Sequence, residues 1–168
     1  MNNLEWNQHC AQSAVLPVCE RILLEGCRSL FKDKPWSGEC LQERTRRIFD
    51  EFVGKKASHD LSEHLLVHLE CLNHGRVYPI RTYPTGCEFI CRDEAVFLGL
   101  IAGIQNGNAT TVALCLDYLC CPSCVQQSRQ TAENLVACLS RCKKYLLPVP
   151  ANVIRDILTR GITTPSLH

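Results

Sequence analysis

The sequence predicts an all-α protein whose helices, about six of them, form one compact array. Apolar residues recur at spacings of three and four along most of the chain, which is typical of helices with one buried face. Segments containing glycine, proline or asparagine separate these patterns. A length of 168 residues suits a single domain with a buried core. We therefore expect one helical domain over residues 1–160 and a flexible C-terminal tail over residues 161–168.

Two apolar stripes predict the first two helices. The first stripe includes two cysteines that we assign to the core, and it consists of Val15, Cys19, Ile22, Leu23, Cys27 and Leu30. The second helix is expected to follow Ser37, a favourable N-cap residue, and to end at Gly54. Its inward-facing residues are predicted to be Leu41, Ile48 and Phe52.

The third helix is predicted from two residues with capping-box spacing, Asp60 and Glu63. It should continue to His74, because the glycine at the next position commonly ends a helix. The stretch RVYPIRTYPTG that follows contains two prolines and a glycine. We therefore expect residues 75–86 to form one long irregular connection.

Capping-box spacing recurs at Thr85 and Glu88, so the fourth helix should begin near Cys87. It should continue through a long apolar run to Gln105. The next segment, ATTVALCLDYLC, predicts either a short buried helix or a strand, because β-branched residues at its start favour neither clearly.

The last part of the chain predicts two more helices. Pro122 interrupts the helical pattern within the CPSC stretch. The helix after it is predicted from an apolar stripe formed by Leu135, Leu139, Cys142 and Leu146. The LPVP stretch ends this helix, and a short final helix is expected over residues 152–160.

Cysteine is the most unusual component of the composition, with 13 residues. The number is odd, and the N-terminal stretch MNNLEWNQHC lacks the basic and apolar segments of a signal peptide. We therefore expect a cytoplasmic protein with reduced thiols, metal ligation or thiol chemistry rather than a disulfide framework. Free cysteine is also a good small core residue, so several of these cysteines need no functional role.

Charge and hydropathy narrow the classes of partner. The net charge is +1 and basic residues occur only in small groups, so nucleic-acid binding is not indicated. The longest apolar run, AVFLGLIAGI, has 10 residues and is too short to cross a bilayer. We therefore expect a protein partner and no membrane.

The main candidate metal site consists of Cys71, His74, Cys87 and Cys91. These residues follow the pattern C-x2-H-x12-C-x3-C, which has the spacing of a structural zinc site. The first pair is expected where one helix ends, and the second pair where the next helix begins. A zinc ion would then join both ends of the irregular connection; the alternative is that the cysteines are buried free thiols.

Two histidines precede this site on the same predicted helix. His64, His68 and Cys71 lie at positions i, i+4 and i+7, on a stripe beside the leucines that face the core. One of the histidines could replace a zinc ligand, or the histidines could form hydrogen bonds that orient the ligands. The alternative interpretation is that they are partly exposed residues at the edge of a helix contact.

A second group of cysteines is a candidate for metal or redox chemistry, and its members are Cys120, Cys121, Cys124, Cys138 and Cys142. The last four have the spacing C-x2-C-x13-C-x3-C. One ion can bind them only if the chain turns near residues 126–130, since a continuous helix would place Cys124 and Cys138 about 21 Å apart. The C-x-x-C motif from Cys121 to Cys124 also fits a redox site, which requires a strand before it.

These patterns predict a small cytosolic metal-binding helical protein with an accessory or regulatory role that acts through protein–protein binding. The sequence contains no G-x-S-x-G, P-loop, H-E-x-x-H or G-x-G-x-x-G motif, so a binding protein is a stronger expectation than an enzyme. Tyrosine and arginine are typical interface anchors. The candidates for partner contacts on the irregular connection are Arg76, Tyr78, Arg81 and Tyr83, with loop packing as the alternative.

Two other functions stay open at this point. One is a thiol-redox or iron–sulfur protein that uses the Cys120–Cys124 cluster, and such a cluster could also include Cys87 and Cys91. The other is a metal-free helical adaptor with free thiols. Zinc remains the first expectation because His74 suits zinc better than it suits an iron–sulfur cluster.

Overall fold

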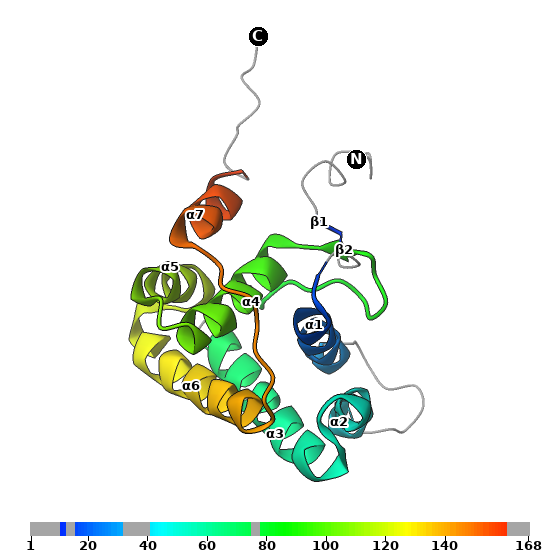
Figure 1. The fold of residues 1–168 in the computed structure, drawn as a ribbon. Helices are drawn as coiled ribbons and strands as arrows, with labels where there is room; N and C mark the ends of the chain where they lie inside the picture. Colours follow the sequence, from blue (N-terminus) through cyan, green and yellow to red (C-terminus); the bar gives the residue numbers. More distant parts are fainter. Residues whose placement is uncertain (1–10, 13–15, 32–40, 75–77, 161–168) are drawn as a thin grey trace.

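The computed structural model describes residues 11–12, 16–31, 41–74 and 78–160, and over these residues it confirms the all-α prediction (Figure 1). The α-helices are α1 (Val18–Leu30), α2 (Leu41–Val53), α3 (Lys55–Asn73), α4 (Arg92–Gln105), α5 (Ala109–Leu119), α6 (Val125–Arg141) and α7 (Ala151–Thr159). A short 3-10 helix, η3 (Pro122–Cys124), precedes α6. Two short strands, β1 (Ala11–Gln12) and β2 (Phe89–Ile90), pair in antiparallel orientation. The predicted tail, residues 161–168, lies outside the described residues.

Helix α4 lies at the centre of the array (Figure 1). It contacts α1, α5, α6 and α7, while α3 packs against both α2 and α6. Residues 96–103 of α4 are all buried. The long apolar run of the sequence is therefore a core helix that packs against neighbours on several sides, as expected for a helix without a polar face.

Helices α1 and α2 approach closely at Gly26. A Cβ atom on Gly26 would lie 2.3 Å from the ring of Phe49, which is fully buried. We expect Gly26→Ala to lower the free energy of unfolding by about 1–3 kcal/mol, because the buried ring leaves no room for a methyl group.

Chemical denaturation of a double-mutant cycle tests this contact. Phe49→Leu should cost less stability in the Gly26→Ala background than in the wild type, since the smaller side chain makes room for the methyl group. Gly26→Ala with wild-type stability would mean that α1 and α2 do not pack this closely.

Helix α3 begins five residues before its predicted start near Asp60. Gly54 adopts a φ of 82°, which turns the chain directly from α2 into α3. The backbone N–H groups of Ala57 and Ser58 donate to the Gly54 carbonyl, at 3.1 and 3.0 Å. Asp60 and Glu63, which have capping-box spacing, therefore lie inside a continuous helix, and both side chains are exposed there.

Helix α4 begins later than predicted. Thr85 and Glu88 do not start a helix, because residues 78–88 are irregular and β2 follows them. The N-cap is Cys91, whose backbone N–H donates to the Glu94 carboxylate at 2.9 Å in a capping box. The prediction that both Cys87 and Cys91 lie at the start of this helix is therefore wrong for Cys87.

The ATTVALCLDYLC segment is helix α5 rather than a strand. Asn108 caps it, and its side chain accepts a hydrogen bond from the Thr111 N–H at 3.1 Å. The buried face of α5 carries Val112, Cys115 and Leu116, at helical spacing.

The connector between α6 and α7 (residues 142–150) crosses the C-terminal end of α4 (Figure 1, orange). The Gln105 side chain donates to the Lys144 carbonyl at 2.9 Å and accepts from the Leu146 N–H at 2.8 Å. Helix α6 ends at Arg141, so the prediction that Leu146 lies within this helix is wrong. Leu146 is nonetheless buried, because the connector inserts it into the core.

Candidate functional site

The guanidinium group of Arg28 is the centre of a buried network that joins α1 to the loop before α4. It pairs with Glu94 through two bonds, Nε to Oε1 at 2.8 Å and Nη2 to Oε2 at 3.0 Å, and both side chains are fully buried. Its remaining N–H groups donate to the Glu25 carboxylate and to the carbonyls of Cys87 and Phe89. A planar guanidinium with several donors suits such a site, where every buried charge needs partners.

Two adjacent carboxylates at the start of α4 hold the backbone of the loop. Asp93 accepts from the Arg81 N–H at 2.8 Å, and Glu94 accepts from the Tyr83 N–H at 2.9 Å. The Tyr118 hydroxyl of α5 donates to Asp93 at 2.7 Å. Burial, together with this bond to Asp93, raises the pKa of Tyr118 to about 12.

Further bonds fix both ends of the irregular loop, residues 78–88. The Ile80 N–H donates to the Asn73 side chain at 2.8 Å, and the Gly86 N–H donates to Glu25 at 2.9 Å. Side chains from α1, α3 and α4 thus bind successive backbone groups of the loop. This loop is irregular in structure, yet side chains satisfy several of its backbone hydrogen-bonding groups.

The candidate partner residues differ in their exposure. Tyr78 is 72 % exposed and the Arg81 side chain is also exposed, so both can contact a partner directly. Tyr83 is half-buried. Arg76 lies outside the described residues.

The four residues of the predicted zinc site fall into two different surroundings. Cys87 and Cys91 lie beside the Arg28 network, where the Cys91 thiol donates to the Arg81 carbonyl at 3.1 Å. Burial and the nearby charge of Glu94 raise the pKa of the Cys91 thiol to about 12. Cys71 instead faces α6, with its sulfur 3.5 Å from an oxygen of Ser128. Within the described ranges, no three Cys, His, Asp or Glu side chains converge closely enough to hold a metal ion.

Cysteines from both sequence candidates meet at another place, which we name the thiol cluster: Cys71, Cys120, Cys121 and Cys124, with His74 beside them. The sulfurs of Cys121 and Cys124 lie 3.8 and 3.6 Å from the His74 carbonyl oxygen. The Ser123 hydroxyl lies 3.3 and 3.8 Å from the same two sulfurs.

The thiols of this cluster influence one another. A hydrogen bond from Cys124 lowers the pKa of the Cys121 thiol, and the same bond raises the pKa of Cys124. A charge on Cys71 would raise the pKa of Cys120 and of Cys124, although burial is the largest cause for Cys120. The cluster can therefore release its first proton, from Cys121, more readily than the next ones.

The other two cysteines of the second sequence candidate lie far from the thiol cluster. Helix α6 is continuous, with Cys124 as its N-cap and Cys142 as its C-cap. The turn near residues 126–130 that a four-cysteine site requires is absent from α6, so one ion cannot reach both ends. Cys138 is 2 % exposed and packs in the core, where burial raises its pKa.

The two candidate histidines have different roles. His64 is half-buried on α3, whereas His68 is fully buried and packs against Phe97 of α4, with ring centroids 6.0 Å apart. The prediction that both histidines flank the core is therefore wrong for His68. Its Nδ1 lies 2.9 Å from the Thr131 hydroxyl, and burial lowers the pKa of His68 to about 3. Its Nε2 is buried and has no hydrogen-bond partner among the described residues.

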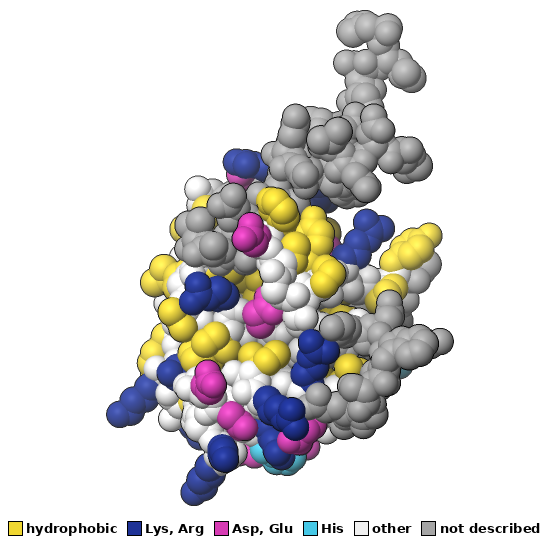
Figure 2. Space-filling view, turned by 90° about the vertical axis from the view of Figure 1, so that its right-hand side faces the viewer, with side chains coloured by type: hydrophobic (Ala, Val, Ile, Leu, Met, Phe, Trp, Pro, Cys, Tyr) yellow, Lys and Arg dark blue, Asp and Glu magenta, His cyan; other side chains and the backbone are white. Residues whose placement is uncertain are grey.

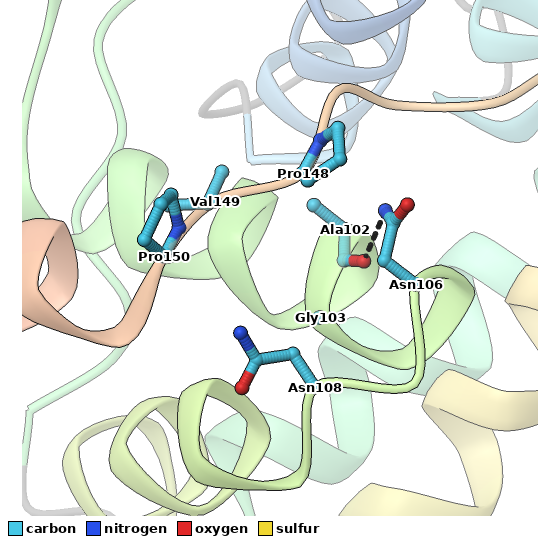
Figure 3. A pocket seen from close by; sticks show the side chains of 7 residues that line it. All are labelled: Ala102, Gly103, Asn106, Asn108, Pro148, Val149 and Pro150. Atoms are coloured by element: carbon cyan, nitrogen blue, oxygen red, sulfur yellow. Dashed lines mark hydrogen bonds between the residues drawn. The ribbon is translucent and has the colours of Figure 1, made fainter.

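A shallow hollow of ≈ 280 Å³ lies where the connector passes over α4 (Figure 3). Its lining residues are Ala102, Gly103, Asn106, Asn108, Pro148, Val149 and Pro150. None of these side chains is a nucleophile or titrates near neutral pH. In Figure 3 the Asn106 amide is turned toward the Ala102 carbonyl, to which it donates at 2.8 Å. This hollow therefore offers no catalytic group.

Sequence reasoning missed the residues that position the loop, namely Arg28, Asp93 and Glu94. Arg28 follows Leu24 by four residues and so falls on the buried stripe of α1, which was the one available signal. Glu94 follows Cys91 with capping-box spacing, but cysteine is not a usual N-cap residue.

No helix in the described part of the chain is both long and apolar enough to cross a membrane. No protein-family model matches the chain, and comparisons with curated proteins and with solved structures give no match either.

Proposed function

We propose that this protein is an accessory or regulatory protein that binds a protein partner through the loop of residues 78–88. The observation that carries the proposal is the contrast between the loop's backbone and its side chains. Bonds to Asp93, Glu94 and Arg28 hold the backbone, while Tyr78 and Arg81 remain exposed. A loop that is already ordered loses little conformational entropy on binding, so its contacts contribute more to affinity.

The chemistry of the loop and of the surface favours a protein as the partner. Tyrosine and arginine are enriched among residues that dominate binding energy at protein interfaces. On the face seen in Figure 2, Lys and Arg side chains are mixed with Asp, Glu and apolar side chains, and no single sign of charge dominates. Such a surface does not attract a polyanion such as nucleic acid.

We also propose a cytoplasmic location. The described cysteines, including Cys27, Cys115 and the thiol cluster, are free thiols. A reducing compartment maintains this state.

Affinity capture with purified wild-type and variant proteins tests the partner-binding proposal. Tyr78→Ala and Arg81→Ala should each weaken binding to a captured protein about tenfold or more, which corresponds to about 1.4 kcal/mol or more. Both variants should remain folded, because the two side chains are exposed.

Tyr145→Ala is the matched control, since Tyr145 is 62 % exposed but lies on the connector instead of the loop. It should leave the affinity unchanged. Equal binding by the wild type, Tyr78→Ala and Arg81→Ala would exclude the loop as the binding surface.

The thiol cluster has two candidate functions, thiol–disulfide catalysis and metal ligation. A thiol–disulfide enzyme with a C-x-x-C motif requires a strand before the first cysteine, and here helix α5 precedes Cys121. The cluster therefore favours metal ligation over redox catalysis.

A further inference from the structure

We propose that Cys71, His74, Cys121 and Cys124 form a binding site for a zinc ion, with three thiolates and one imidazole as ligands. The sequence patterns pair Cys71 and His74 with Cys87 and Cys91, whereas the structure places them beside the C-x-x-C pair. The proposal stands independently of the partner-binding loop.

Each half of this site has the local geometry that a zinc site needs. Cys121 and Cys124 flank a tight turn, in which the Cys124 N–H donates to the Cys121 carbonyl at 2.9 Å. Cys71 and His74 form the last turn of α3, where the His74 N–H bonds to the Cys71 carbonyl at 3.2 Å. Two pairs of ligands, each with two intervening residues, are typical of structural zinc sites.

The fold brings these halves together. The backbone of His74 lies against the second pair, since its carbonyl oxygen is 3.6 Å from the Cys124 sulfur and 3.8 Å from the Cys121 sulfur. Cys71 lies near the start of α6, with its sulfur 3.5 Å from an oxygen of Ser128. The pair Cys71 and His74 and the pair Cys121 and Cys124 are thus neighbours in space, although 46 residues of the chain lie between His74 and Cys121.

The protonated thiols have only weak partners, which an ion can replace. Their bonds to the His74 carbonyl and to Ser123 and Ser128 are long contacts of sulfur with oxygen. In their present rotamers these side chains do not converge on one point. The proposed site therefore requires the thiols, and the exposed His74 side chain, to rotate about their Cα–Cβ bonds until they reach zinc–ligand distances of about 2.0–2.3 Å. A divalent cation would also remove the repulsion between neighbouring thiolates.

Cys120 is the fourth thiol of the cluster, and it is less suited to be a ligand. Its thiol donates to the Leu116 carbonyl of α5 at 2.9 Å, and it is buried. An all-thiolate site would need Cys120 in place of His74, and it would suit an iron–sulfur cluster.

A zinc ion at this site would have a structural role. It would fasten the C-terminal end of α3 to the junction of α5 and α6, which consists of Cys120, Cys121 and η3. Binding free energy at such a site adds to folding free energy, so removal of the metal should lower the melting temperature of the whole protein.

Metal analysis of the purified full chain, loaded with zinc and dialysed, tests the proposal. The wild type should retain a single zinc ion per chain, and it should be colourless. Cys71→Ser, Cys121→Ser and Cys124→Ser should each lose most of it, whereas His74→Cys should keep it because thiolate also binds zinc. The matched controls are Cys87→Ser, Cys91→Ser and Cys138→Ser, which should keep full zinc.

A second measurement needs no variant and so does not depend on how well the variants fold. Alkylation of the wild-type thiols, mapped by mass spectrometry with zinc and with a chelator, should show zinc-dependent protection at Cys71, Cys121 and Cys124. Reactivity of Cys87 and Cys91 should be the same in both conditions.

Several results would overturn the proposal. A wild type that retains no zinc, or zinc loss confined to Cys87→Ser and Cys91→Ser, would exclude this set of ligands. A brown protein that contains iron and needs Cys120 would replace the zinc site with an iron–sulfur cluster. Equal alkylation of Cys121 with and without zinc would also exclude the proposed zinc site.

Discussion

Replacing Arg28 with methionine should lower the free energy of unfolding by about 3–5 kcal/mol, because it leaves the buried carboxylate of Glu94 without its counter-charge. Arg28 is 1 % exposed and Glu94 is 0 % exposed, so water cannot replace the lost partner. The change also removes the donors to the carbonyls of Cys87 and Phe89. Urea denaturation of the wild type and the variant measures the difference.

Two further variants separate the charge from the geometry. Arg28→Lys keeps the charge but loses the two-bond pairing with Glu94, so it should still be clearly destabilised. Arg46→Met removes an exposed pair with Glu43 on α2 and should cost no more than about 1 kcal/mol. If Arg28→Met and Arg46→Met lower the free energy of unfolding by similar amounts, the buried pair of Arg28 and Glu94 contributes no more to stability than the exposed pair of Arg46 and Glu43.

Arg28→Lys also tests whether the Arg28 network supports the proposed binding function. The Arg28 network holds the loop that carries Tyr78 and Arg81. Arg28→Lys should therefore weaken partner binding even under conditions where the protein remains folded, because the loop must be ordered at the moment of binding.

Acid should destabilise the protein through His68, and this is the second large effect that we expect. Its pKa is about 3 in the folded protein and about 6.5 in an unfolded chain. The unfolded chain therefore takes up the proton first, so the stability from neutral His68 is complete above about pH 6.5. It is lost progressively as the pH falls toward 3, and at pH 5 the loss is about 2 kcal/mol.

Denaturation at pH 7.5 and at pH 5 measures this difference. In His68→Leu the loss between the two pH values should be smaller than in the wild type by about 2 kcal/mol, whatever the stability of the variant at pH 7.5. His59→Gln is the control, since His59 is exposed on the same helix, and it should follow the wild type. Parallel pH profiles for the wild type and His68→Leu would contradict the assignment of a neutral buried imidazole.

Local patterns predicted the helices better than their boundaries. Apolar spacing predicted α1 and α6, and the break at LPVP predicted α7, and these signals depend on neighbouring residues alone. The three helices lie where the sequence places them, apart from the end of α6. The starts of α3 and α4 were wrong, because capping-box spacing also occurs by chance inside helices and loops. What decided those starts was the turn at Gly54 and the bonds of Glu94 to the loop.

The candidate site was predictable in its parts but not in its arrangement. The sequence singled out Cys71, His74, Cys121 and Cys124, each in a pair with two intervening residues. It paired them with Cys87 and Cys91 and with Cys138 and Cys142, whereas the structure places the two pairs beside each other. Spacing along the chain carries no information about contacts between distant helices.

The sequence by itself determined the all-α class, the buried run of α4 and the cysteine pairs, because these depend on the spacing of residues within single segments. Only the tertiary structure decided that Arg28 lies under the loop, that His68 is neutral in the core and that two cysteine pairs meet at the end of α3. Each of these contacts joins helices that are distant in the chain. They arise because burying the apolar faces together fixes which polar and sulfur atoms become neighbours.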